Sequence, residues 1–148
     1  MLRKNFSSGA PLEKNMGYSR AVRIGDFIFV GGTTAVQPDG SVFGEGDSYA
    51  QMKYILEKQI KIIEDAGGKK EDVYSVNLFL TPEFDKSGWK AYTELFHDVM
   101  PLCTAVTISK LNRPTQLLEI EMSAALGTEI GEPLKTSVFR GNFENAIT

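Results

Sequence analysis

The alternation of apolar and polar side chains is clearest near the end of the chain, from Leu117 to Ala125. Apolar residues recur at every second position there, which is the period of a half-buried β-strand. Glu119 and Glu121 share the opposite face, with their Cα atoms roughly 6.6 Å apart. Like charges at this distance disfavour each other's ionisation. The pattern therefore predicts a strand with an acidic face that needs a structural or functional explanation.

The rest of the pattern predicts two helices and four more short strands. Apolar residues recur every three or four positions up to Ala66, which indicates a helix that packs one face on a sheet. Asp47 or Ser48 can cap its first turn, and Gly67 can end it. A second helix is predicted at 86–99. The strands are predicted at 19–24, 27–31, 73–81 and 103–109, with a hairpin turn between the first two.

The element order β-β-α-β-α-β-β predicts a single-domain α+β sandwich, with two helices on one face of a mixed sheet. This domain is expected to span residues 17–126. Residues 1–16 are polar and contain proline, so we expect an extended N-terminal arm. Residues 127–148 form a C-terminal extension, for which a tail docked through its apolar residues and a frayed end are both open.

Composition narrows the range of functions. A chain of 148 residues is long enough for one domain with a buried core. Its apolar runs are too short for a membrane span, and its beginning lacks the apolar centre of a signal peptide. One cysteine excludes an intrachain disulfide, and one histidine excludes a histidine-rich zinc site. The lone cysteine suits a reducing cytosol, so we expect a cytoplasmic protein with no membrane partner, and the net charge of −3 argues against a nucleic-acid partner.

Several short motifs occur in a fixed order between residues 17 and 126. The run P-x-x-T-x-V begins at Pro101, and E-I-E-x-x-A begins at Glu119. Upstream of both lie Gly17-Tyr18-Ser19, Phe29-Val30-Gly31-Gly32, Gln51, Ala66-Gly67 and Phe79-Leu80-Thr81. Together these motifs resemble the RidA/YjgF family of small imine and enamine deaminases. The resemblance implies a homotrimer of chorismate-mutase-like topology with ligand clefts between adjacent subunits, and it implies no metal or organic cofactor.

The resemblance also implies which residues line the cleft. Deaminating members of the family carry an arginine two residues after the proline, where it can bind the carboxylate of a 2-imino acid through two hydrogen bonds. This chain has Cys103 at that position, and a thiol cannot make such a contact. Arg113 and Arg20 are alternative anion-binding groups, although solvated surface arginines are common. The implied cleft residues are Tyr18, Gly31, Gly32, Thr33, Trp89, Cys103, Thr104 and Glu119.

Glu119 and Cys103 are the candidate catalytic residues. Hydrolysis of an imine needs a water molecule delivered to the C=N carbon and a proton carrier for the departing amine. Glu119 is suited to hold the water or the substrate nitrogen, and the alternative is a carboxylate that bonds only the backbone or a basic side chain. Cys103 is a nucleophile if its thiol pKa is lowered, and otherwise a small packing residue. His97 is expected to be structural, while Trp89 and Tyr18 have packing roles as alternatives.

These features lead to one functional prediction with three alternatives. The chain is predicted to be a RidA-like homotrimer whose clefts hydrolyse, and so deaminate, or bind a small imine or enamine metabolite without the arginine clamp. Whether it is an enzyme is left open. The alternatives are a trimer that only binds or scavenges a metabolite, a ribonuclease or translation inhibitor, and a chaperone-like protein. The expected partners are the metabolite and further copies of the same chain.

Overall fold

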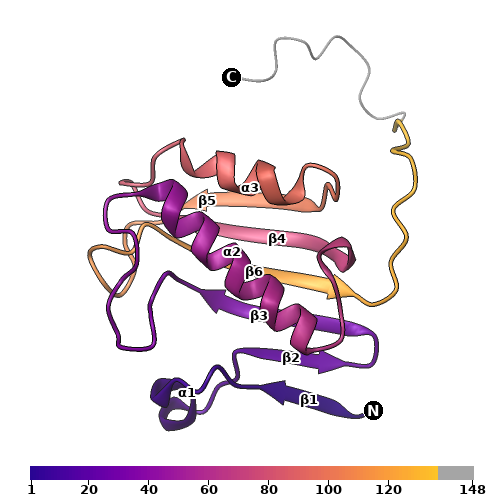
Figure 1. Cartoon of the computed structure of the whole chain (residues 1–148), viewed down its shortest axis with the longest axis horizontal. Helices are drawn as coiled ribbons and strands as arrows, with labels where there is room; N and C mark the ends of the chain where they lie inside the picture. Colours follow the sequence, from indigo (N-terminus) through magenta and orange to yellow (C-terminus); the bar gives the residue numbers. More distant parts are fainter. Residues whose placement is uncertain (137–148) are drawn as a thin grey trace.

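The computed structural model describes residues 1–136, which form a six-stranded sheet with helices α2 and α3 on one face (Figure 1). The strand order is β1-β2-β3-β6-β4-β5; β4 and β5 are parallel, and the other neighbours are antiparallel. The predicted α+β class with a mixed sheet is confirmed. The elements are β1 (Arg3–Phe6), α1 (Pro11–Met16), β2 (Ala21–Ile24), β3 (Phe27–Thr33), α2 (Ser48–Asp65), the 3₁₀ turn η1 (Lys70–Asp72), β4 (Val73–Leu80), α3 (Gly88–Phe96), β5 (Leu102–Thr107) and β6 (Leu118–Ala125).

The N-terminal segment differs from the expected extended arm, and that expectation is wrong. Residues Arg3–Phe6 pair antiparallel with β2 and so add one strand to the sheet. Pro11 begins α1, which has six residues and is followed by Gly17 in the left-handed conformation, with φ of 86°. Neither element is long enough to show a hydrophobic period, which is why the sequence pattern does not reveal them.

The other boundaries lie within three residues of their predicted positions. The largest difference is at α3, which ends at Phe96 because the chain turns there and Met100 takes a left-handed backbone conformation with φ of 54°. Residues 127–136 contain no helix or strand. The apolar residues proposed to dock the tail lie outside the described part of the chain.

The hydrophobic core lies between the sheet and the two long helices. Figure 1 shows α2 lying across β6 and β3, with α3 beside it. The predicted period of two on β6 is confirmed, because alternate residues of this strand face the helices and are at most 2 % exposed. These residues are Leu118, Ile120, Met122 and Ala124.

Gln51 connects α2 to the segment that leads into β6. Its side chain is fully buried, and its amide nitrogen donates to the carbonyl oxygens of Thr115 at 2.9 Å and Gly44 at 3.3 Å. Its amide oxygen accepts the N–H of Leu117 at 2.9 Å. Two of these three hydrogen bonds hold the segment that leads into β6, and with it the position of Glu119, while the third holds the loop at Gly44.

We expect Gln51→Leu to lower the free energy of unfolding by about 3 kcal/mol, because each buried polar group left without a partner costs about 1–3 kcal/mol. Urea denaturation measures the loss. Gln59→Leu is the matched control on the same helix. Gln59 is also fully buried, but it donates one bond, at 2.8 Å to the Ile120 carbonyl, and its Oε1 has no partner among the described residues. Equal losses in the two variants would contradict the role given to Gln51.

Candidate functional site

The sheet face turned away from α2 and α3, which we call the open face, carries the two carboxylates. On β6 the partly buried positions alternate with the fully buried ones, so Glu119, Glu121 and Ser123 share this face. The pairing register then identifies their neighbours on the other strands. These neighbours are Phe27 and Phe29 of β3, Ser75, Asn77 and Phe79 of β4, and Leu102, Thr104 and Val106 of β5.

The side chain of Glu119 is partly buried on the open face and makes no hydrogen bond or ion pair with another described residue. Its neighbour Glu121 differs, because it accepts a hydrogen bond from Asn77 at 3.1 Å. Burial raises the pKa of Glu119, and the charge of Glu121 raises it further against the lowering effect of Arg20. A carboxyl group with a raised pKa and free lone pairs is a candidate for proton transfer to a ligand.

Two glycines bring the backbone of β3 against Glu119. The register between β3 and β6 shifts between Val30 and Thr33, so Gly31 and Gly32 form a bulge. A Cβ atom on Gly32 would lie 2.9 Å from Cδ of Glu119, which is closer than two such atoms approach in proteins. Glycine at position 32 therefore leaves the space that the carboxyl group occupies.

A groove of about 290 Å³ crosses the open face beside Glu121. This volume is at the lower end of the range for small-molecule sites, which is about 300–1,000 Å³. Glu119 does not line the groove, but it lies two residues before Glu121 on the same strand face. The polar residues that line the groove are Ser19, Arg20, Asn77, Glu121 and Ser123.

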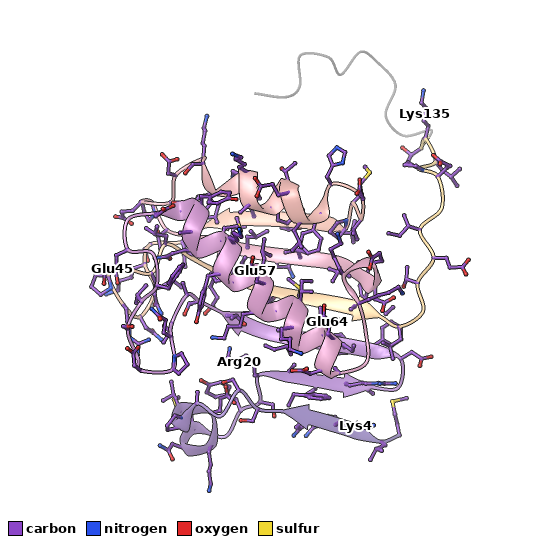
Figure 2. The ribbon with its side chains drawn as sticks, in the orientation of Figure 1. Lys4, Arg20, Glu45, Glu57, Glu64 and Lys135 are labelled. Carbon is purple, nitrogen blue, oxygen red and sulfur yellow. The ribbon has the colours of Figure 1, made fainter. Side chains whose placement is uncertain are left out.

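The guanidinium of Arg20 is occupied by contacts within the chain. Its Nε lies 3.3 Å from Oε2 of Glu13, and its Nη1 donates to the carbonyl oxygen of Gly32. The ring of Tyr18 lies 5.7 Å from the guanidinium carbon. Figure 2 shows Arg20 at the end of the sheet where α1 lies. Arg20 is therefore not a free anion clamp in the single chain.

Cys103 and Trp89 lie on the helix-covered side of the sheet. Cys103 pairs with Val76, which is fully buried under the helices, so the thiol points to that side. Burial is the main cause that raises the pKa of Tyr92 on α3, and the neighbouring Cys103 raises it further. Trp89 packs edge-on against Tyr92 and Phe84, with ring centroids 5.7 Å and 6.0 Å apart. Within one chain, the sheet therefore separates Cys103 and Trp89 from Glu119.

The remaining predicted site residues are dispersed. Thr104 lies on the open face, in the same row of the sheet as Glu121. Thr33 is buried, and its hydroxyl donates to the carbonyl of Gly31 at 2.8 Å. Arg113 is exposed in the loop before β6, and its guanidinium contacts no charged partner among the described residues. The imidazole of His97, at the end of α3, is 78 % exposed.

No group of three or more His, Cys, Asp or Glu side chains within residues 1–136 is placed to hold a metal ion. Over the same range, no helix combines the length and apolar character that crossing a membrane requires.

Comparison with known protein families agrees with this geometry. The model of the family described as Endoribonuclease L-PSP matches residues 9–126. The chain belongs to this family. The matched range contains α1, all the later elements and the whole candidate site, so the similarity is not confined to the fold's core.

Individual relatives give the same result for this L-PSP family member. An uncharacterised protein of Streptomyces coelicolor is 32 % identical over 125 residues, which cover 84 % of this chain and 92 % of that protein. A RutC family protein of Pyrococcus abyssi is 34 % identical over 122 residues, covering 80 % and 93 %. A crystal structure from Mycobacterium tuberculosis, a member of the YjgF/YER057c/UK114 family, has a TM-score of 0.73 and 29 % identity, and covers 84 % of this chain and 100 % of that one. The predicted RidA/YjgF membership is confirmed.

Two residues beside the candidate site escaped prediction from the sequence. Asn77 contacts Glu121. Alternation within β4 puts Asn77 and Val76 on opposite faces of the sheet, but only the register between β4 and β6 shows that Asn77 lies beside Glu121. Glu13 lies in the segment expected to be an extended arm. Its signal is weaker, because a single acidic residue in a short polar segment shows no period.

We expect Glu119→Gln to stabilise the protein at neutral pH but not in acid. The folded-state pKa of Glu119 lies above its ordinary value, so between the two values the folded protein binds more protons than the unfolded chain. The free energy of unfolding therefore falls as pH rises through that window, and glutamine escapes this loss. Thermal unfolding of both proteins over a pH series measures the difference. A Tm difference that does not change with pH would contradict the raised pKa.

Proposed function

We propose that this protein hydrolyses the C=N bond of a small imine, or of the enamine that tautomerises to it, with Glu119 holding the attacking water. The observation that supports this most is the state of Glu119: partly buried, with a raised pKa and no partner among the described residues. The glycine bulge makes room for this carboxyl group, and the groove beside Glu121 has the size of a small metabolite.

In this mechanism the carboxylate of Glu119 accepts a proton from water as the water oxygen bonds to the imine carbon. The π electrons of the C=N bond move to nitrogen, which takes up the proton that Glu119 received and gives a carbinolamine. Glu119 then accepts the proton of the carbinolamine O–H and passes it to nitrogen, which makes nitrogen a leaving group, and the C–N bond breaks as the oxygen lone pair left by that proton forms the C=O bond. The products are a carbonyl compound and ammonia or an amine, and the Glu119 carboxylate is restored.

The substitution of Cys103 for the family's arginine changes how the substrate is held. Arg20 is paired with Glu13, so its guanidinium is not a free cation. We propose that the side chains of Thr104 and Asn77, together with the bulged backbone of β3, hold the substrate by hydrogen bonds. These groups suit a neutral or cationic imine better than one that carries a carboxylate.

The family description names a ribonuclease, but the open face does not favour that activity in this chain. Binding of RNA depends on basic side chains that neutralise phosphates. The groove is lined by Glu121, with Glu119 beside it, and Arg20 is neutralised by Glu13. Two neighbouring carboxyl groups on this face disfavour a phosphate backbone, so we favour a small uncharged or cationic substrate.

We propose that the active unit is a homotrimer in which the open face of each copy is covered by its neighbours. Large apolar side chains are exposed on this face, among them Phe27 at 48 % and Leu102 at 70 %. All six residues of β5 are exposed. Apolar patches of this kind mark interfaces, and a sheet with an apolar face needs a second layer. The number three comes from the family resemblance.

Glu119→Gln is expected to slow imine hydrolysis about 10²–10⁴-fold, the usual contribution of a general acid–base group. Aldimines and 2-imino acids can be generated in place by amine and amino-acid oxidases, and ammonia release above the uncatalysed rate is measured. The wild-type rate should rise as pH increases through the raised pKa of Glu119, because the carboxylate form accepts the proton. Glu64→Gln, on the outer surface of α2 (Figure 2), is the control.

The assay also separates the enzyme from its alternatives. Unchanged turnover in Glu119→Gln would rule out the role proposed for this residue. Saturable thermal stabilisation by an imine analogue without product would indicate a binding protein instead. Cleavage of RNA that weakens with added salt would favour the ribonuclease activity.

We expect Val106→Lys to break the trimer, because an ammonium group would have to leave water inside the interface. Sedimentation velocity measures the oligomeric state. Ile130→Lys is the matched control: Ile130 is 48 % exposed and Val106 is 47 % exposed, but Ile130 lies outside the sheet. A monomeric wild-type protein, or a Val106→Lys trimer as stable as the control, would exclude this arrangement.

A further inference from the structure

Arg20 contacts the glycine bulge with both its backbone and its side chain. Its carbonyl oxygen accepts the N–H of Gly31 at 2.9 Å, and its Nη1 donates to the carbonyl oxygen of Gly32. A bulge interrupts the regular ladder between neighbouring strands, so the backbone groups within it need other partners. One residue therefore supplies partners to both glycines, and the second of these abuts Glu119.

Glu13 in turn holds the guanidinium of Arg20. The Glu13 side chain is 2 % exposed, which is unusual for a carboxylate and requires full pairing. It accepts hydrogen bonds from the Ser7 hydroxyl at 2.8 Å, from the Ser8 N–H at 3.0 Å and from the Ser8 hydroxyl. Burial opposes ionisation of Glu13, but the serine hydrogen bonds and Arg20 outweigh it and lower its pKa.

We propose that Glu13 and Arg20 are positioning residues for Glu119: α1 delivers Glu13, Glu13 fixes the guanidinium of Arg20, and Arg20 holds the Gly31–Gly32 bulge against the Glu119 carboxyl group. This arrangement matters for catalysis only if the role proposed for Glu119 is right. The arrangement itself can be tested independently, because the geometry and the protonation of that carboxyl group can be measured whether or not the protein turns over an imine.

The charges around Glu119 make the arrangement testable. The charged groups that act on it are Arg20, which favours the ionised form, and Glu121, which disfavours it. Its other near neighbours across the sheet are Gly32 on β3 and Phe79 on β4, and neither can titrate. Loss of the Arg20 cation must therefore raise the pKa of Glu119, whereas a general loosening that admits water would lower it towards the ordinary value.

The central experiment compares Arg20→Met with Arg23→Met. Arg23 lies on β2, three residues after Arg20, and also donates to backbone carbonyls, those of Gly25 at 3.0 Å and Ala66 at 2.8 Å, but neither bond is to the bulge. Two NMR readouts are recorded on the whole protein: hydrogen exchange of the Gly31 amide, and the carboxyl ¹³C titration of Glu119, identified by its absence in Glu119→Gln. In Arg20→Met we expect exchange at Gly31 to accelerate about tenfold and the titration midpoint to rise.

Two milder variants separate the contact from the charge. Glu13→Gln keeps the shape of the side chain and can still accept from Ser8, but it removes the counter-ion of Arg20. We expect faster exchange at Gly31 and a lower midpoint for Glu119, opposite in sign to Arg20→Met. Arg20→Lys keeps the cation but not the guanidinium geometry, so exchange should accelerate while the midpoint stays near that of the wild type.

The outcomes decide the inference without reference to activity. It is overturned if Arg20→Met affects exchange at Gly31 no more than Arg23→Met does, or if its Glu119 midpoint fails to rise. It is also overturned if Glu13→Gln leaves both readouts unchanged, since Glu13 would then only anchor α1. Should imine hydrolysis be absent while these shifts occur, the proposed function fails and the positioning role stands.

Discussion

The packing of α2 on one face of β6 is the constraint on which the candidate site depends. Burial of alternate side chains from Leu118 to Ala124 leaves only one register in which the apolar set faces the helices. A slip of one residue would bury Glu119 and expose the apolar set. The hydrophobic effect in the core therefore places the carboxylates on the open face, and Gln51 secures the point at which the strand begins.

The parts of the fold that follow a hydrophobic period could be predicted from the sequence. The two long helices and the five strands from residue 21 onwards lie within three residues of their expected positions, because burial imposes a period of two or of three to four over many residues. The candidate site was harder to predict from the sequence. Alternation alone placed Glu119 on an acidic face, but the glycines and the cleft position of Glu119 came from a family resemblance, whereas Glu13 was missed because six residues of α1 cannot display a period.

The face of the sheet on which a strand residue lies is harder to predict from the sequence than the strand itself. Cys103 and Thr104 are adjacent in the sequence, and both were expected near Glu119. The parallel register of β5 on β4 places Thr104 beside Asn77 on the open face and Cys103 beside the buried Val76 on the other. That register depends on the whole crossover through α3, which no local pattern encodes.

This separation bears on what a single chain can do. A sheet lies between the thiol of Cys103 and the carboxyl of Glu119, so no side-chain rotation within one copy can bring them to the same substrate. A site that uses both residues needs two copies, with the edge strand β5 of one facing the open face of another. The exposure of every residue of β5 and of the apolar side chains on the open face is consistent with that requirement. The oligomer is then a condition for such a site to exist, whatever reaction it performs.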